Sequence, residues 1–185
     1  MTGIEPAVLA GCPETYRTII ETSSGIFEIE AHRGWSLHGA DRFFQLVEQR
    51  YYDDSRFYRV VAGKWVQFGI AGAPSVALAW RGRTIPDDRR VQSNTRGFVA
   101  FANTGPDTRA TQVFINLSDN AAQNDLEAGF APFGQTFSGF GGLSAVDWPQ
   151  WAGANPVGQL ADVETPCEIF ADIMPDDGQI WPASV

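Results

Sequence analysis

One arginine and two glutamines, Arg59, Gln67 and Gln112, stand in segments that otherwise alternate apolar and polar residues as strands do. Strand packing does not require such side chains, so we assign the chemistry of the chain to them. A guanidinium is a fixed fork of hydrogen-bond donors that stays charged. If 56–61 pairs with 65–70 across a short connection, Arg59 and Gln67 face one surface, and the glutamine carbonyl holds the direction of the guanidinium. The alternative is a structural arginine that pairs with one of the 22 Asp and Glu residues.

Apolar side chains near these polar ones are candidates for the wall of a pocket. The candidates are Trp65, Phe101, Phe114, Leu126 and Phe130. For any one of them taken alone, an ordinary core position is the alternative. Asn103 precedes a Thr-Gly-Pro turn at the end of an expected strand, where its backbone is placed to pair with an extended peptide. The alternative for Asn103 is an ordinary turn residue.

Short strands and tight turns must position these residues, because Gly and Pro punctuate the alternating runs. We expect an amphipathic helix at 40–51, a short helix at 142–151 and a polar loop at 118–128. The expected strands form a hairpin at 16–21 and 25–31, followed by 56–61, 65–70, 98–103, 112–117, 132–137 and 167–173, the last of which pairs with the hairpin. The expected elements are about eight strands and two helices, and strands do not alternate with helices along the chain. This pattern predicts a mainly β fold, namely a closed antiparallel barrel of about eight strands that is capped by two α-helices.

The length of 185 residues fits one domain with a sizeable core. We expect a loose N-terminal tail at 1–14 and a single domain at 15–185, with loop insertions near 71–97 and 153–166. Hydrophobic residues make up 44% of the chain, which argues against bulk disorder.

Charge and composition exclude several classes of partner. The net charge of −9 argues against nucleic acid and anionic membranes, and no apolar run approaches the roughly 18–20 residues of a membrane span. His32 and His38 are the only histidines and Cys12 and Cys167 the only cysteines, so we expect no metal and no cofactor. The two cysteines are either unrelated thiols or a disulfide between the ends of the chain. We expect a monomer. Leu9 to Cys12 matches a lipoprotein processing box, but only eight residues, with Glu5 and Pro6 among them, precede it. We therefore favour the cytoplasm, and the alternative is an exported form if the true start lies upstream.

Several ordered motifs at consistent spacing resemble the cyclophilin-type peptidyl-prolyl cis-trans isomerases. The resemblance covers roughly residues 16 to 140. The motifs are Phe57-Tyr58-Arg59, Val66-Gln67-Phe68-Gly69, Phe101-Ala102-Asn103-Thr104-Gly105-Pro106-Asp107-Thr108, Thr111-Gln112-Val113-Phe114-Ile115 and Phe130-Ala131-Pro132-Phe133-Gly134.

The resemblance implies an eight-stranded barrel with a shallow outer groove that binds an extended peptide, its proline in an apolar pocket. It implies that Arg59 is the catalytic arginine and that Gln67 orients it, with no cofactor. The implied substrate is a proline-containing peptide or protein, whose X-Pro bonds are isomerised to assist folding. The implied substrate-binding residues are Phe57, Trp65, Phe101, Ala102, Asn103, Gln112, Phe114, Leu126 and Phe130.

The chain departs from the family pattern at several groove positions. Lys64 and Trp65 stand where most members have Phe-Met, so Lys64 removes an aromatic wall that Trp65 refills in part. Phe101 replaces a common Met and Phe130 a common His. Asp125 stands where many members have the Trp that binds cyclosporin, which argues against sensitivity to that drug.

Three other functions compete with the isomerase. The first is a non-catalytic proline-peptide-binding module with the same fold, in which Lys64 and Asp125 disrupt the pocket and abolish catalysis of isomerisation. A carrier with a small ligand inside the barrel conflicts with the large residues expected in the interior. A carboxylate-dependent hydrolase ranks last, because no pair of acidic residues forms a recognisable motif.

Overall fold

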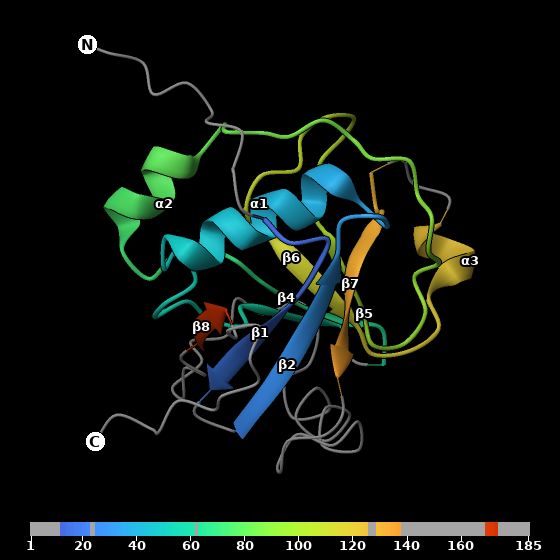
Figure 1. The fold of residues 1–185 in the computed structure, drawn as a ribbon, viewed down its shortest axis with the longest axis horizontal. Coiled ribbons are helices and arrows are strands. Elements are labelled where there is room, and N and C mark those ends of the chain that lie inside the picture. Colours follow the sequence, from blue (N-terminus) through green and yellow to red (C-terminus); the bar gives the residue numbers. More distant parts are fainter. Residues whose placement is uncertain (1–11, 23–24, 62, 126–128, 138–168, 174–185) are drawn as a thin grey trace.

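The computed structural model describes residues 12–22, 25–61, 63–125, 129–137 and 169–173 (Figure 1). Eight strands form one antiparallel sheet in the order β3-β4-β6-β5-β7-β2-β1-β8, which confirms the mainly β prediction. Closure of the sheet between β3 and β8 stays a prediction. The strands are β1 (Thr15–Thr22), β2 (Gly25–His32), β3 (Arg59–Val61), β4 (Trp65–Phe68), β5 (Phe98–Phe101), β6 (Val113–Asn116), β7 (Pro132–Phe137) and β8 (Ile169–Ile173).

The expected hairpin and the pairing of the last strand with it are confirmed. Tyr16 lies opposite Ala31 in the β1–β2 register, and Ile20 lies opposite Ala171 in the β1–β8 register. The strands β3, β4, β5 and β6 are shorter than expected by two to three residues. The expected helix at 142–151 and the insertion at 153–166 lie outside the described residues.

Three helices accompany the sheet. The helix α1 (Leu37–Glu48) crosses the sheet in Figure 1, while α2 (Pro74–Trp80) and α3 (Ala121–Asn124) lie on opposite sides of it. The prediction of connections without helices at 71–97 and 118–128 is therefore wrong for α2 and α3. Pro74 at the first helical position is a common helix start that the abundance of Gly and Pro in this segment obscured. No helix among the described residues is long and apolar enough to cross a bilayer.

The helix α1 begins three residues earlier than expected because a distant carboxylate caps it. Asp88 accepts hydrogen bonds from the backbone N–H groups of His38 (3.1 Å) and Gly39 (3.0 Å). A carboxylate is favourable at a helix N-terminus, where N–H groups lack partners. Asp88 is fifty residues away in the sequence, so local capping signals do not reveal this start.

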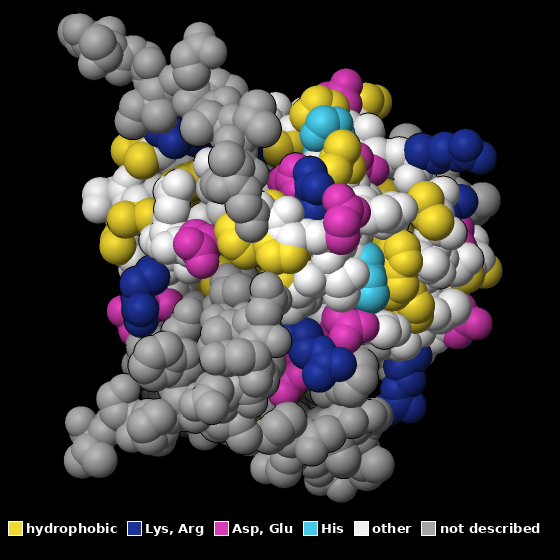
Figure 2. All heavy atoms as spheres, viewed as in Figure 1, with side chains coloured by type: hydrophobic (Ala, Val, Ile, Leu, Met, Phe, Trp, Pro, Cys, Tyr) yellow, Lys and Arg dark blue, Asp and Glu magenta, His cyan; other side chains and the backbone are white. Residues whose placement is uncertain are grey.

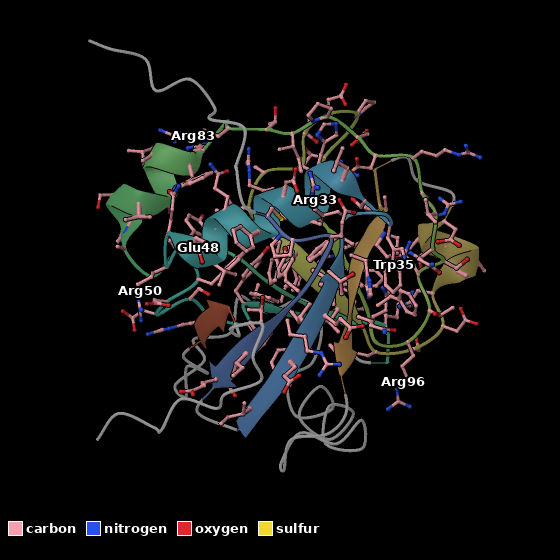
Figure 3. All side chains as sticks on the ribbon, in the orientation of Figure 1. Arg33, Trp35, Glu48, Arg50, Arg83 and Arg96 are labelled. Atoms are coloured by element: carbon pink, nitrogen blue, oxygen red, sulfur yellow. The ribbon has the colours of Figure 1, made fainter. Side chains whose placement is uncertain are left out.

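Aromatic side chains fill the interior between α1 and the sheet (Figure 3). Phe133 packs against Phe43 at 4.9 Å and Phe101 at 5.2 Å between ring centroids, and all three are fully buried. Phe57 packs against Phe68 at 5.2 Å. These rings occupy the space that a ligand inside the barrel would need, so the described interior does not support the carrier alternative.

A buried arginine ties the long 71–97 connection to the rest of the fold. Arg109 is completely buried, and its guanidinium donates to Asp88 (3.0 Å), to the Ser36 hydroxyl (3.4 Å) and to the Pro86 carbonyl. Burial alone would raise the pKa of Asp88. Hydrogen bonds from Ser36, the start of α1 and Arg109 outweigh burial and hold that pKa below its ordinary value. The connection is thus fastened to α1 and to the segment before β6 at one point.

The visible surface mixes charges of both signs. On the face in Figure 2, Lys and Arg side chains alternate with Asp and Glu, and hydrophobic side chains lie between them. Arg50, Arg83 and Arg96 project outward in Figure 3. The described residues on this face form no continuous basic stripe of the kind that binds nucleic acid.

Replacement of Arg109 by Met should strongly destabilise the fold, because it removes a fully buried guanidinium that pairs with the partly buried carboxylates of Asp87 and Asp88. Breaking a buried charge network in this way costs about 3–5 kcal/mol. Denaturant unfolding measures the loss. Arg90→Gln is the control, because it removes a partly exposed ion pair to Asp125 (3.6 Å) worth about 0–1 kcal/mol. Equal losses in the two variants would contradict the role given to Arg109.

Candidate active site

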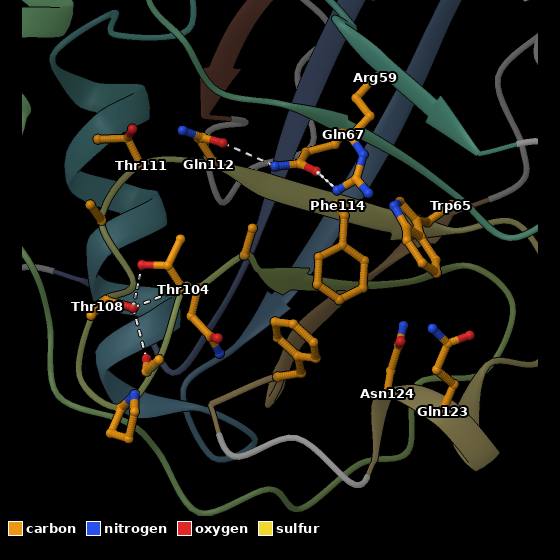
Figure 4. Close-up of a pocket in the computed structure, with 16 residues that line it drawn as sticks. Arg59, Trp65, Gln67, Thr104, Thr108, Thr111, Gln112, Phe114, Gln123 and Asn124 are labelled. Carbon is orange, nitrogen blue, oxygen red and sulfur yellow. Dashed lines mark hydrogen bonds between the residues drawn. The ribbon is translucent and has the colours of Figure 1, made fainter. Parts of the chain in front are cut away.

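A groove of about 700 Å³ opens between the inner strands and the turns that follow them (Figure 4). One wall comes from β4 and β6, another from the turn after β5, and a third from α3. Its lining residues are Arg59, Trp65, Gln67, Ala102, Asn103, Thr104, Gly105, Pro106, Thr108, Ala110, Thr111, Gln112, Phe114, Gln123, Asn124 and Phe130.

A chain of hydrogen bonds runs along one side of the groove. The antiparallel register places Arg59 opposite Gln67, and Gln67 opposite Phe114. Arg59 Nη1 donates to Gln67 Oε1 at 3.2 Å, and Gln67 Nε2 donates to Gln112 Oε1 at 2.9 Å. The pairing of Arg59 with Gln67, inferred above from the spacing of two strands, is what the register produces.

The direction of each amide in this chain follows from the arginine. A guanidinium has donors only, so Gln67 must turn its oxygen toward Arg59 and its nitrogen toward Gln112. Gln112 must then present its oxygen, which also accepts a hydrogen bond from the Tyr58 hydroxyl. The amide nitrogen of Gln112 makes no hydrogen bond to the described residues, so it is a donor available to a ligand.

Three aromatic rings form the apolar part of the groove. Phe114 lies 5.4 Å from Phe130 in an edge-to-face contact and 6.4 Å from Trp65, between ring centroids. Figure 4 shows the Phe114 ring pointing into the space between the other walls. Rings arranged in this way offer a concave apolar surface of the kind that binds a compact aliphatic ring.

A tight turn forms the polar end of the groove. The Thr108 hydroxyl donates to the Gly105 carbonyl at 2.7 Å and accepts from the Thr104 N–H at 2.9 Å (Figure 4). The same turn is held to the long connection, since the Asp87 N–H donates to Asp107 (2.7 Å) and the Asp107 N–H donates to Asp87 (3.1 Å). The connection therefore supports the groove without lining it.

Buried asparagines hold the opposite wall. Asn116, on β6, accepts hydrogen bonds from the side chains of Asn120 (2.9 Å) and Asn124 (3.2 Å). It donates to Asn94 at 3.2 Å, and Asn94 in turn donates to the Phe130 carbonyl at 2.9 Å. This network attaches α3 and Phe130 to the strand that carries Phe114.

The model of the cyclophilin type peptidyl-prolyl cis-trans isomerase family matches residues 18–153, which is more than half of the chain. This chain belongs to that family.

Two curated relatives have names from the same family. The chain is 32% identical over 108 residues to "Peptidyl-prolyl isomerase cwc27" of Rhizopus delemar, covering 55% of the chain and 20% of the relative. It is 30% identical over 123 residues to "Peptidyl-prolyl cis-trans isomerase" of Acinetobacter baylyi, covering 65% of each. The cyclophilin-type chain thus spans a fifth of one relative and just under two thirds of the other.

Solved structures share the cyclophilin fold. The cyclophilin type isomerase cgd2_1660 of Cryptosporidium parvum superposes with a TM-score of 0.68 at 19% identity, covering 88% of this chain and 99% of that one. A second structure of the same protein, in the presence of the dipeptide Ala-Pro, gives 0.66 at 19% identity, with coverages of 86% and 99%. The Mimivirus cyclophilin gives 0.65 at 16% identity, with coverages of 93% and 95%.

Most residues that the sequence singles out meet at the groove, although their roles stay predictions. Those that line it are Arg59, Gln67, Trp65, Ala102, Asn103, Gln112, Phe114 and Phe130. Phe101 does not, because successive strand residues face opposite sides and its ring lies in the core. Phe57 does not, because β3 begins only at Arg59 and the Phe57 ring packs inward. Leu126 lies outside the described residues.

Sequence reasoning missed residues that the tertiary fold brings to the groove or to its hydrogen-bonded side chains. In the motif Tyr58 is only the neighbour of Arg59, yet its hydroxyl donates a hydrogen bond to Gln112. Gln123 and Asn124 belong to α3, within a segment expected to be a loop. The position of Tyr58 next to Arg59 is only a weak indication that its hydroxyl takes part in the site. No local sequence pattern indicates that Gln123 does.

The two notable departures from the family pattern have different environments. Lys64 lies beside the groove, with its ammonium 5.9 Å from the Trp65 ring centroid. Asp125 does not line the groove and instead accepts hydrogen bonds from the Asn94 backbone (3.0 Å) and side chain (2.9 Å). Burial tends to raise the pKa of Asp125, but these hydrogen bonds lower it overall. Asp125 thus supports the wall that Asn94 holds.

Tyr58 should stay protonated well above the usual range. Burial raises its pKa from the ordinary 10.0 to about 12, against the opposing charge of Arg59. At pH 10, Tyr58→Phe should therefore leave the tyrosinate absorbance of the folded protein unchanged. In denaturant the same substitution should remove one tyrosine's share of that absorbance, which provides the control. A lower absorbance of the folded variant at pH 10 would contradict a raised pKa for Tyr58.

Proposed function

We propose that this chain is a peptidyl-prolyl cis-trans isomerase that acts on X-Pro bonds in peptides and proteins and thereby assists folding. The observation that carries the proposal is the guanidinium of Arg59 at the groove, held by Gln67 at 3.2 Å beside an apolar surface formed by Phe114, Trp65 and Phe130. Family membership and the names of the two relatives support the same activity.

The reaction needs a positioned donor and no reactive group. Rotation about a peptide bond meets a barrier of about 18–20 kcal/mol because resonance is lost as the bond twists. In the twisted state the proline nitrogen becomes pyramidal and regains a lone pair. A donor aimed at that lone pair stabilises the twisted state more than the planar one, which is differential binding of the transition state. Arg59 is that donor in the proposal, and Gln67 fixes its direction.

The remaining groove residues supply the rest of the stabilisation. A million-fold acceleration requires about 8 kcal/mol, whereas one charge-assisted hydrogen bond contributes about 1.5–3 kcal/mol. We assign the difference to binding of the proline ring against Phe114 and Phe130, pairing of the peptide with the Ala102–Asn103 segment, and donation from Gln112 to a peptide carbonyl. The Cryptosporidium parvum relative, crystallised in the presence of Ala-Pro, supports a proline-containing ligand for this groove.

A binding module without catalysis is the second candidate, because Lys64 stands beside the groove where an aromatic residue is usual. Such a module would hold proline peptides in the same place. It would not accelerate their isomerisation, so a rate measurement separates the two candidates.

Arg59→Ala should lower kcat/KM for an X-Pro tetrapeptide by orders of magnitude, because the donor to the proline nitrogen is lost while the fold is kept. A coupled or NMR exchange assay on purified protein measures the rate. Arg56→Ala is the matched control, since Arg56 is an exposed arginine three residues away that does not line the groove. An Arg59→Ala variant as fast as the parent would overturn the assignment of Arg59. A well-folded parent without activity would favour the binding module.

Gln112→Glu separates orientation of the arginine from binding of the peptide. A carboxylate can still accept from Tyr58 and from Gln67, so the hydrogen bonds that hold Arg59 persist. The substitution removes the amide donor and adds a negative charge that repels a peptide carbonyl. Loss of one hydrogen bond of about 1 kcal/mol alone predicts roughly fivefold weaker binding, so we expect at least that loss. We expect the dissociation constant and KM to rise with a smaller change in kcat. A fall in kcat with unchanged KM would mean that Gln112 acts through Arg59 instead.

A further inference from the structure

The groove differs in charge from the chain as a whole. The chain has a net charge of −9, yet the described residues that line the groove include Arg59 and no Asp or Glu. Lys64, the only lysine in the sequence, stands next to the lining residue Trp65. Among the described lining residues the groove therefore carries one positive charge and no negative one, within an acidic protein.

Lys64 and Arg59 lie around the same indole. The guanidinium carbon of Arg59 lies 5.7 Å from the Trp65 ring centroid, and the ammonium of Lys64 lies 5.9 Å from it. Five of the other described arginines have a carboxylate within 4.0 Å, namely Arg17, Arg33, Arg50, Arg90 and Arg109. Neither Arg59 nor Lys64 has a carboxylate within 4.0 Å among the described residues, so their mutual repulsion is not offset by a counter-ion there.

Lys64 is directed toward the groove by α3. Its ammonium donates to Gln123 Oε1 at 3.3 Å, and Gln123 lines the groove. An ammonium has three donors, so two of them remain without partners among the described residues. The indole face attracts the cation and keeps the flexible side chain near the groove.

We propose that Lys64 is a specificity-determining residue that selects proline peptides with an acidic residue next to the proline. A peptide carboxylate near Trp65 would accept hydrogen bonds from the ammonium and reduce the repulsion between Lys64 and Arg59. A basic residue at the same place would add to that repulsion. The inference rests on the proposed function, because it concerns the peptide that occupies the same groove.

Matched peptides test this preference. Each pair has Glu or Gln at one position, before or after the proline, in an otherwise neutral tetrapeptide, and both kcat/KM and the dissociation constant are measured. At low ionic strength we expect the parent to favour Glu over Gln by about threefold or more at one position, with the ratio falling as salt is added. Lys64→Gln should abolish the ratio, whereas Lys64→Arg should keep it. Arg56→Gln, an exposed cation outside the groove, is the matched control and should also keep it.

A single lysine allows the contact to be mapped chemically. Carbodiimide treatment of the complex should join the glutamate of the peptide to Lys64, and mass spectrometry identifies the linked residue. Lys64→Arg retains the charge but has no amine to couple, so its cross-link should disappear while its preference for Glu persists.

The outcomes distinguish this inference from the proposed function. Equal kcat/KM for Glu and Gln at every position, or a preference that survives in Lys64→Gln, would overturn the role of Lys64 and leave the isomerase intact. Absence of catalysis on every peptide would overturn the proposed function, and the ratio of dissociation constants would still decide whether Lys64 selects acidic ligands.

Discussion

An arginine cannot accept a hydrogen bond, and this limit determines the arrangement of one whole side of the groove. Because Arg59 only donates, Gln67 can offer it only an oxygen, and each following amide takes the one orientation that remains. This chain of hydrogen bonds ends at the amide nitrogen of Gln112, which is left to donate to a ligand. A proton-transfer site would need groups that change charge, whereas this arrangement needs only groups whose direction is constant.

The side chains of the groove keep a constant direction only if the groove walls are fixed relative to one another. Hydrogen bonds between buried polar groups fix these walls. Arg109 and Asp88 fasten the long connection to the start of α1, while Asn116 fastens α3 to β6. Such contacts are favourable only when every buried group has a partner, which is why networks of this kind specify one arrangement.

A glycine marks a further close contact, since a Cβ on Gly69 would lie 2.4 Å from the Thr111 carbonyl oxygen beside Gln112. Its φ of +107° is likewise accessible mainly to glycine.

Charges of opposite sign serve different needs in different parts of the chain. Acidic residues predominate overall and favour solubility, and many of them pair with arginines away from the groove. The groove keeps its cations unpaired among the described residues, at the cost of some repulsion. A site whose cations find their counter-ion in the ligand discriminates between peptides by their charge, and this discrimination depends on ionic strength.

The sequence by itself determined the strand periodicity, the antiparallel β architecture and the meeting of Arg59 with Gln67, because those follow from local alternation and short connections. It also indicated the family, through ordered motifs. Only the tertiary structure decided that Tyr58 donates to Gln112 and that Gln123 lines the groove. It also decided that Phe57 and Phe101 do not line it, and that α1 begins at Leu37 under the carboxylate of Asp88. Each of these depends on contacts between residues far apart in the chain or on which face a residue turns at a strand boundary. Local patterns do not carry that information, because hydrogen bonds and packing across the fold select among several conformations that each segment allows.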